Sequence, residues 1–236
     1  MANLVLVHGA WHGAWCWSKL VPLLVAQGHN VSAPDLPGHG QDKTPTTRVS
    51  MKKYVRRIVE AVGQFDGKVV LVGHSMGGLV ISQVAEQIPT RIDQLVYISA
   101  LLLQNGGSLL ARMQHEQGQS LAIATEDGTG LVVPDEVFNQ VFYSDCSDED
   151  RAWAKPQLVT QAALPFTTPV AVSDDAFGTV PRSYIHCDLD KVVPIEEQME
   201  MVAASPCGRV EHVSAGHMVM ISAPEPLASA FASVVG

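Results

Sequence analysis

The chain has 236 residues, of which 47% are hydrophobic and 17% are charged. A chain of this length can bury roughly 70% of its unfolded surface, so the composition predicts one large globular domain or two small ones and argues against disorder. Lys and Arg number 15 against 24 Asp and Glu, which gives a net charge of −9. Nucleic-acid and anionic-membrane binders normally carry a basic surface. The one basic cluster has the spacing of a solvated helix face: Lys52, Lys53, Arg56 and Arg57.

Cysteine usage and apolar run lengths bear on the cellular compartment. The four cysteines, at positions 16, 146, 187 and 207, lack the Cys-x-x-Cys spacing of zinc or redox sites, which predicts reduced thiols. The N-terminal residues lack the basic segment and long apolar run of a signal peptide. No apolar run reaches the ~18 residues of a membrane span. We therefore expect a soluble cytoplasmic protein with neither a nucleic-acid nor a membrane partner.

Short apolar runs alternate with helical patterns through both ends of the chain. The patterns predict strands at 4–7, 30–33, 68–72, 94–100, 182–187 and 209–213. They predict helices at 15–27, 50–65, 194–203 and 224–234, and one that ends near residue 87. Continuous apolar strands between helices are typical of a parallel sheet covered on both faces. The fold class expected is therefore α/β, with a mostly parallel, doubly wound sheet of about six strands.

This alternation fails between residues 102 and 178. The stretch mixes polar residues with helix-length apolar patterns at 137–142 and 153–164. Such an excursion is too long for an ordinary loop. We interpret 102–178 as a helical cap, or lid, inserted into a core formed by 1–101 and 179–236, and not as an independent domain.

A Gly-x-Ser-x-Gly motif occupies residues 73–77. It directly follows an apolar strand and opens an apolar helix, which is the setting of a nucleophile elbow. Because a sharp turn at this place exposes its serine, the motif predicts Ser75 as a nucleophile. The alternative is an ordinary glycine-rich turn between a strand and a helix.

A serine hydroxyl needs a base, and the base needs an orienting acid. In hydrolases of this fold the chain order is Ser, acid, His, and His217 follows the last predicted strand. Asp190 and Asp188 both follow the strand at 182–187, and we favour Asp190 because it lies deeper in the loop. His74 lies inside the motif, where its side chain is expected to point differently from that of Ser75. His186 and His212 fall within strands and are predicted to be structural, and three further histidines are predicted to face solvent: His29, His39 and His115.

The oxyanion that develops during acyl transfer needs two backbone N–H donors. One is expected from Met76, the residue after the nucleophile. The other is expected from the loop after the first strand, where Gly9 permits close approach and Ala10 donates.

Three sequence blocks carry a resemblance to a known family: 6–15, 71–78, and 216–218 together with Asp190 and Lys191. The chain resembles an α/β-hydrolase, and more narrowly the branch that contains plant hydroxynitrile lyases and salicylate-binding methylesterases. The resemblance implies Ser75, Asp190 and His217 as the catalytic triad, and the Ala10 and Met76 amides as the oxyanion hole. It implies no metal and no organic cofactor, and it allows a homodimer because many relatives are dimers.

Two positions separate esterases from lyases within this branch. The similar lyases carry a lysine directly after the catalytic histidine and a threonine beside the first-strand histidine. A cation there stabilises departing cyanide, and the hydroxyl binds the cyanohydrin oxygen. Here the two positions hold Met218 and Gly9, which can do neither, so the sequence favours an esterase.

We therefore expect a serine carboxylesterase that acts through an acyl-enzyme on small to medium hydrophobic esters of aryl, methyl or pyrethroid-like type. No charged residue is obviously aimed into the pocket. The pocket candidates are Gly9, Trp11, Leu102, Leu121, Phe138, Phe142, Trp153, Phe166 and Met218.

Three rival hypotheses stay open at this point. Cyanide release from mandelonitrile would indicate a hydroxynitrile lyase. A lactonase or C–C bond hydrolase would use the same triad and differ only in its pocket. A non-catalytic small-molecule-binding protein is the rival from another class, and the complete triad argues against it.

Overall fold

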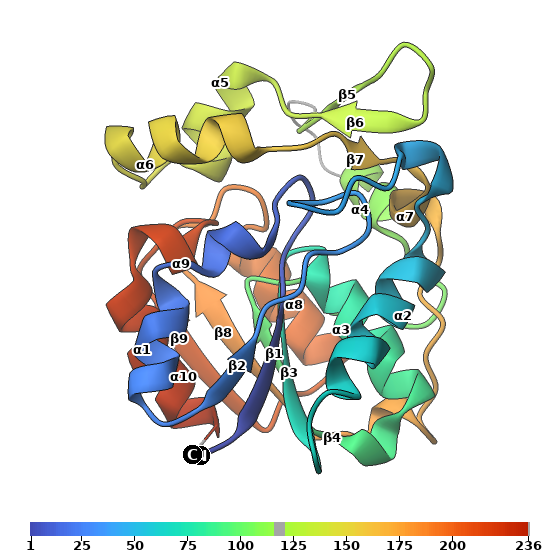
Figure 1. Cartoon of the computed structure of the whole chain (residues 1–236), viewed down its shortest axis with the longest axis vertical. Helices are drawn as coiled ribbons and strands as arrows, with labels where there is room; N and C mark the ends of the chain where they lie inside the picture. The colour runs from blue at the N-terminus through green and yellow to red at the C-terminus, as the bar shows by residue number, and fades with distance from the viewer. Residues whose placement is uncertain (116–120, 236) are drawn as a thin grey trace.

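A six-stranded sheet forms the centre of the computed structural model, which describes residues 1–115 and 121–235 (Figure 1). Its order is β2-β1-β3-β4-β8-β9, and every neighbouring pair is parallel. The strands are β1 (Asn3–Val7), β2 (Asn30–Ser32), β3 (Val69–His74), β4 (Ile92–Ile98), β8 (Arg182–Cys187) and β9 (Arg209–Val213). All six residues of β3 are buried, as expected for a strand covered on both faces. The predicted fold class is confirmed.

Helices cover both faces of this sheet. They are α1 (Leu20–Ala26), α2 (Met51–Val62), α3 (Gly77–Gln87), α8 (Ile195–Ala204), α9 (Val219–Ser222) and α10 (Pro224–Val235). Helix α1 packs against α10 on one face, and α2 packs against α3 on the other (Figure 1). The Ser50 hydroxyl caps the N-terminus of α2 by accepting from the Lys53 amide. One face of α2 is buried in the core. Within the described ranges, no helix has the length and apolarity needed to cross a membrane.

Two predicted helices differ from the structure, and a proline explains each difference. The pattern at 15–27 divides into a 3₁₀ turn, Ala14–Trp17, and helix α1. Pro22 lacks an amide hydrogen, so it is tolerated only in the first turn of a helix, which places the start of α1 just before it. The helix predicted at 153–164 is wrong: α6 (Asp148–Ala154) ends shortly before Pro156, and a strand follows.

The excursion at 102–178 places a small antiparallel sheet and several short helices over one end of the central sheet (Figure 1). The sheet comprises β5 (Ile123–Ala124), β6 (Gly130–Val132) and β7 (Gln161–Ala162). The helices are α4 (Leu109–His115), α5 (Asp135–Val137), a π-helical turn Phe138–Phe142, α6, and α7 (Leu164–Thr167). The cap is therefore mixed in structure and not purely helical.

The last part of the excursion returns along the core. The amide and the hydroxyl of Ser173 both donate to the Glu86 carboxylate on α3, each at 2.8 Å. A 3₁₀ turn, Phe177–Thr179, also contacts α3. The division into a core and a cap at residues 102 and 178 stays a prediction.

Candidate active site

Ser75 occupies the sharp turn between β3 and α3. Its φ of 54° lies in the left-handed region, which residues with side chains rarely adopt. A Cβ at Gly77 would lie 2.4 Å from the Val7 carbonyl oxygen, and one at Gly73 would lie 2.8 Å from the Gly77 backbone. Glycine is therefore required at both positions of the motif, and the turn presents the Ser75 side chain to a cavity.

Asp190 and His217 form a buried pair at the carboxyl ends of the strands. His217 Nδ1 donates to Asp190 Oδ2 at 2.7 Å, and the two side chains are 1% and 0% exposed. The other carboxylate oxygen accepts from the amides of Val192 and Val193, at 2.7 and 3.1 Å. These bonds fix the carboxylate; in a neutral imidazole whose Nδ1–H donates to Asp190, Nε2 is the acceptor nitrogen.

Asp188, the alternative acid, is placed elsewhere. It accepts from His212 at 2.8 Å on the outer side of the sheet, where the His212 side chain is 52% exposed. The structure thus brings Asp190, and not Asp188, to His217.

Ser99 is a site residue that the sequence analysis missed. It follows β4 with a φ of 38°, and its hydroxyl donates to Asp190 Oδ2, the oxygen that also binds His217. The available signal was a serine directly after a core strand, at the sheet edge where Ser75 and Asp190 lie. A serine in the sequence does not indicate a left-handed backbone, so the direction of the Ser99 side chain toward Asp190 could not be predicted.

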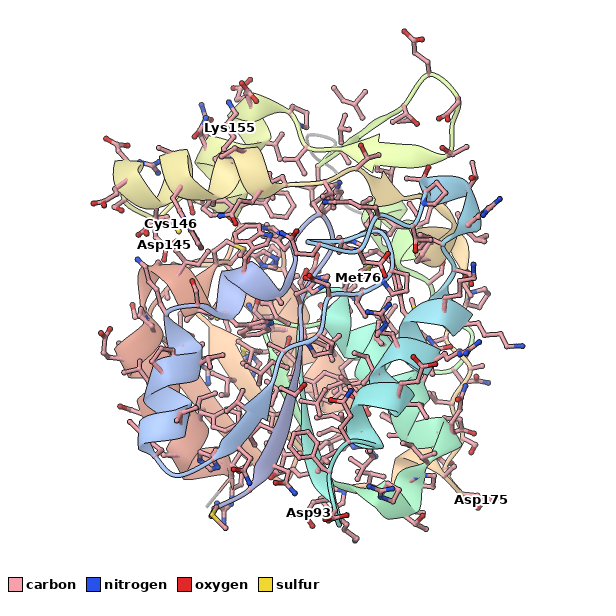
Figure 2. All side chains as sticks on the ribbon, viewed as in Figure 1. Met76, Asp93, Asp145, Cys146, Lys155 and Asp175 are labelled. Carbon is pink, nitrogen blue, oxygen red and sulfur yellow. The ribbon has the colours of Figure 1, made fainter. Side chains whose placement is uncertain are left out.

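Ala10 and Met76, the two expected amide donors, line the same cavity as Ser75. Among the hydrogen bonds of the described residues, neither amide has an acceptor, so both N–H groups are available to a ligand. Figure 2 shows Met76 where the core and the cap meet. Next to Ala10, Trp11 has a φ of 62°, and its indole donates to the Leu131 carbonyl at 2.9 Å, which ties this loop to the cap.

Ser75 lines the cavity, and its hydroxyl is not bonded to His217. In the described part of the chain, the Ser75 hydroxyl makes no hydrogen bond. The Phe142 ring packs edge-on against the His217 imidazole, with centroids 5.5 Å apart, and lines the cavity beside Ser75. Catalytic hydrogen bonds are often long in the absence of substrate. We therefore expect the hydrogen bond between the Ser75 hydroxyl and His217 to form when a ligand fills the cavity.

Comparison with known proteins identifies the family. Residues 4–230 match the profile described as the alpha/beta hydrolase family. The chain belongs to this family. It is 33% identical to a pyrethroid hydrolase of Sphingobium wenxiniae, over 98% of this chain and 87% of that protein. It is 32% identical to methylesterase 1 of Arabidopsis thaliana, over 98% and 95%.

A solved structure agrees with these relatives. The crystal structure of a pyrethroid hydrolase from Sphingobium faniae JZ-2 has a TM-score of 0.87 and 31% identity, covering 98% of this chain and 96% of that chain. The resemblance to the methylesterase branch, drawn from the three sequence blocks, is confirmed.

Two further contacts position the His217 loop of this hydrolase. His74 Nε2 donates to the His217 carbonyl at 2.8 Å, and the two rings lie 4.5 Å apart. From the cap, Asp145 Oδ2 accepts from the Gly216 amide at 2.6 Å, and a Cβ at Gly216 would lie 2.5 Å from the Asp145 carboxylate. Figure 2 shows Asp145 on the side of the cap that faces the core. The loop is therefore held from both sides.

Buried imidazoles surround the site and are held neutral. Burial lowers the pKa of His8, His39 and His74, and it lowers the pKa of His12 to about 3. For His74, the nearby His217 adds to this effect. At neutral pH these rings carry no charge, so they do not repel a proton taken up by His217.

The predicted positions of the other histidines need one correction. His39, predicted to face solvent, is 1% exposed because the cap residue Gln161 covers it, with His39 Nε2 3.0 Å from Gln161 Oε1. His186 is buried in β8, and His29 is half-buried. The side chain of His115 lies outside the described part of the chain.

The cavity beside Ser75 is narrow and mostly apolar. Its free volume is about 40 Å³, room for a few waters, so we expect cap side chains to move when an ester enters. Four of the predicted pocket residues line it: Trp11, Leu121, Phe142 and Phe166. The wall also contains residues that were not predicted: Leu101, Leu109, Val192, Val193 and the ion pair of Arg112 and Glu197.

The remaining pocket candidates lie outside this lining. Leu102 is buried and its amide donates to Met201 Sδ, while its neighbour Leu101 faces the cavity. Phe138 packs on Tyr143, with ring centroids 4.3 Å apart. Trp153 is 39% exposed and packs on Trp15.

Gly9 and Met218 also lie off the cavity wall. A Cβ at Gly9 would lie 2.9 Å from Ser75 Cβ, so residue 9 packs directly against Ser75. Met218 is fully buried in the core. Among the described residues, no three His, Cys, Asp or Glu side chains are placed to hold a metal ion.

Proposed function

We propose that the protein is a serine carboxylesterase that hydrolyses small to medium hydrophobic esters of aryl, methyl or pyrethroid-like type through an acyl-enzyme on Ser75. The observation that carries this proposal is the buried Asp190–His217 pair beside the strained Ser75 turn, at one end of an apolar cavity. The similarity to a pyrethroid hydrolase and to methylesterase 1 supports the ester chemistry.

Acylation follows from the tautomer of His217. Because Nδ1 donates to Asp190, Nε2 carries the lone pair and takes the Ser75 proton as the hydroxyl attacks the acyl carbon. The tetrahedral oxyanion accepts from the Ala10 and Met76 amides, each worth ~3 kcal/mol of transition-state stabilisation. His217 then gives its proton to the departing alcohol, which leaves an ester between Ser75 and the acyl group.

Deacylation repeats the same steps with water. His217 removes a proton from water, whose oxygen attacks the acyl carbon, and the same two amides hold the second oxyanion. The Ser75 oxygen leaves with the proton from His217, and the carboxylic acid is released. Each step uses side chains and amides of this chain, so the proposed reaction needs neither a metal nor an organic cofactor.

The positions that separate lyases from esterases favour hydrolysis. Met218 supplies no cation beside His217, and it is fully buried. At residue 9 a threonine would press its Cβ against Ser75. Neither of the two features that hydroxynitrile lyases of this branch use is therefore present.

Replacement of the nucleophile tests the proposal. Ser75→Ala should lower kcat for p-nitrophenyl and methyl esters by ~10⁴-fold or more, because no other group forms the acyl-enzyme. Ser229→Ala, on the exposed side of α10, is the matched control and should leave kcat unchanged. Intact turnover in Ser75→Ala would contradict the proposal. Cyanide release from mandelonitrile in place of ester hydrolysis would favour a lyase, and tight binding without turnover would favour a binding protein.

The cellular setting is a further part of the proposal. All four cysteines are free thiols, which is typical of proteins in a reducing compartment such as the cytoplasm. We propose that the esterase works there on small-molecule substrates, without nucleic-acid or membrane partners, and that it is a candidate homodimer. Size measurement in solution at two protein concentrations tests the dimer.

A further inference from the structure

One ion pair stands in the otherwise apolar wall that the structure describes around Ser75. Arg112 comes from α4 of the cap, and Glu197 comes from the first turn of α8 in the core. Arg112 Nε and Nη2 both donate to Glu197 Oε2, at 2.9 and 2.5 Å. Each side chain is 20% exposed. The rest of the described wall beyond Ser75 consists of apolar residues: Ala10, Trp11, Met76, Leu101, Leu109, Leu121, Phe142, Phe166, Val192 and Val193.

Stability does not account for a charged pair in this place. A partly buried pair loses hydration, and apolar residues of similar volume are often at least as stable. An exposed pair contributes only ~0–1 kcal/mol. A pocket that bound purely hydrocarbon acyl and alcohol groups would gain nothing from a guanidinium in its wall. The pair therefore points to a polar group on the ligand.

The bonding of Arg112 leaves donors unused. A guanidinium has five N–H groups, and Glu197 accepts two of them. In the part of the chain that the structure describes, the remaining three, which include both on Nη1, have no acceptor. They lie in the same rigid plane as the bonds to Glu197, so the carboxylate fixes the direction in which they donate.

The charge of the pair decides what kind of acceptor fits. Glu197 balances the charge of Arg112, and its position in the first turn of α8 is favourable for a carboxylate. A free carboxylate on the ligand would meet Glu197 as well as Arg112 and would have to displace it. A neutral carbonyl or ether oxygen can accept from Nη1 while the pair stays intact.

We propose that Arg112, held by Glu197, is a specificity-determining residue that donates to a second, neutral oxygen of the ester substrate, away from the bond that is hydrolysed. This inference rests on the proposed esterase function. The preferred substrates are then keto, alkoxy or diester compounds whose remaining surface is apolar. An ester of the same shape without the second oxygen should leave the free N–H groups unpaired.

Matched ester pairs test the proposal. The first set is the methyl esters of 4-oxopentanoate, 5-oxohexanoate and 6-oxoheptanoate beside those of pentanoate, hexanoate and heptanoate. The second is 2-methoxyethyl hexanoate beside butyl hexanoate, which places the oxygen on the alcohol side. Acid release measured by pH-stat gives kcat and KM for each, and the quantity compared is the oxo-to-alkyl ratio of kcat/KM.

The expected result is a change in this ratio that is specific to Arg112. For the ester pair with the largest oxo-to-alkyl ratio in the wild type, Arg112→Met should lower that ratio about tenfold, mostly through KM of the oxo ester. The kcat/KM of the alkyl esters should stay within about twofold of the wild type. Arg112→Met combined with Glu197→Met should show the same fall, which removes any effect of an unpaired carboxylate. Arg151→Met is the matched control, because Arg151 also lies in the cap but bonds the Tyr143 carbonyl and Asp148 away from the cavity.

Two outcomes would overturn the proposal. An equal loss for oxo and alkyl esters in Arg112→Met would make the pair only a brace between cap and core. A wild-type preference for monomethyl adipate over methyl 6-oxoheptanoate would mean that the ligand group is charged. Both differ from failure of the esterase function itself, in which no ester of either set is hydrolysed or Ser75→Ala hydrolyses them as fast as the wild type.

Discussion

The edge of the central sheet and the cap contribute to one cavity in different ways. The sheet edge holds its groups through the backbone: the three described non-glycine residues with positive φ, Trp11, Ser75 and Ser99, all lie on its loops at the site. Such strained residues persist only where the surrounding structure fixes them, and they gather at functional sites. The cap reaches the cavity through side chains of short helices and irregular segments, such as Phe142, Phe166 and Arg112.

This difference separates the groups that would perform the reaction from the side chains that would select the substrate. The acid that would orient His217 is held by several bonds: Asp190 accepts from Ser99, His217, Val192 and Val193. The cap side chains that line the cavity are held mainly by packing, so they can change without moving that network. Substitutions at the sheet edge should therefore lower turnover of every ester, whereas substitutions in the cap wall should change the ratio between esters.

The sharpest test of this division is Asp190→Asn. An amide at this position cannot stabilise the imidazolium of His217 and favours the wrong tautomer, so kcat should fall ~10³- to 10⁴-fold for all esters alike. Asp188→Asn, two residues earlier, is the matched control and should change kcat less than twofold, because Asp188 pairs with the half-exposed His212. Comparable losses of kcat in the two variants would mean that the assignment of Asp190 as the acid is wrong.

The same division explains what the sequence could predict. Around Ser75, apolar runs identify the strands, and the glycines of the motif are required by contacts of 2.4 and 2.8 Å, so both the turn and its place in the fold were readable. Asp190 and His217 were readable because each directly follows a strand, and parallel strands end at one edge. Ser99 has the same position after β4, but its bond to Asp190 depends on a backbone angle that a serine does not reveal.

The cap offered no such regularity. Short helices, a π-helical turn and two- or three-residue strands do not repeat with one period, so periodicity could not say which way a side chain points. Leu102 was expected in the wall where Leu101 stands, and Trp153 was expected inside although it packs on Trp15. Arg112 was missed because a lone arginine in a polar stretch gives no sign that it faces a cavity.

A pH experiment probes the junction of the two regions. His12, on a core loop, donates to the Ala10 carbonyl at 2.7 Å and lies 2.9 Å from the Tyr143 hydroxyl of the cap. Burial lowers its pKa from 6.5 to about 3. A histidine buried neutral adds stability that is complete above pH 6.5 and is lost as the pH falls, by about 1.4 kcal/mol per pH unit.

His12→Gln should therefore flatten the pH dependence of folding. Between pH 7 and pH 5 the free energy of unfolding in urea should fall by about 2 kcal/mol more in the wild type than in the variant. Glutamine can still bond Ala10 and Tyr143, so a difference in slope reports the lost titration and not a lost contact. Parallel pH profiles in the two proteins would contradict the expected neutral state of His12.

Asp145 is a cap residue that contacts the loop of His217, and its substitution gives the smallest expected effect. Its carboxylate accepts from the Gly216 amide at 2.6 Å, next to His217, and Asp145 is outside the cavity lining, so it would position the proposed base without touching substrate. Asp145→Ala should lower kcat about tenfold, since one charge-assisted bond is lost, while KM and the ratios between esters stay unchanged. Asp145→Asn keeps an acceptor oxygen and should restore most of the rate. If Asp145→Ala instead changed the ratios and spared kcat, this residue would belong with the selecting wall of the cap, and the boundary between reaction and selection would coincide with the boundary between core and cap.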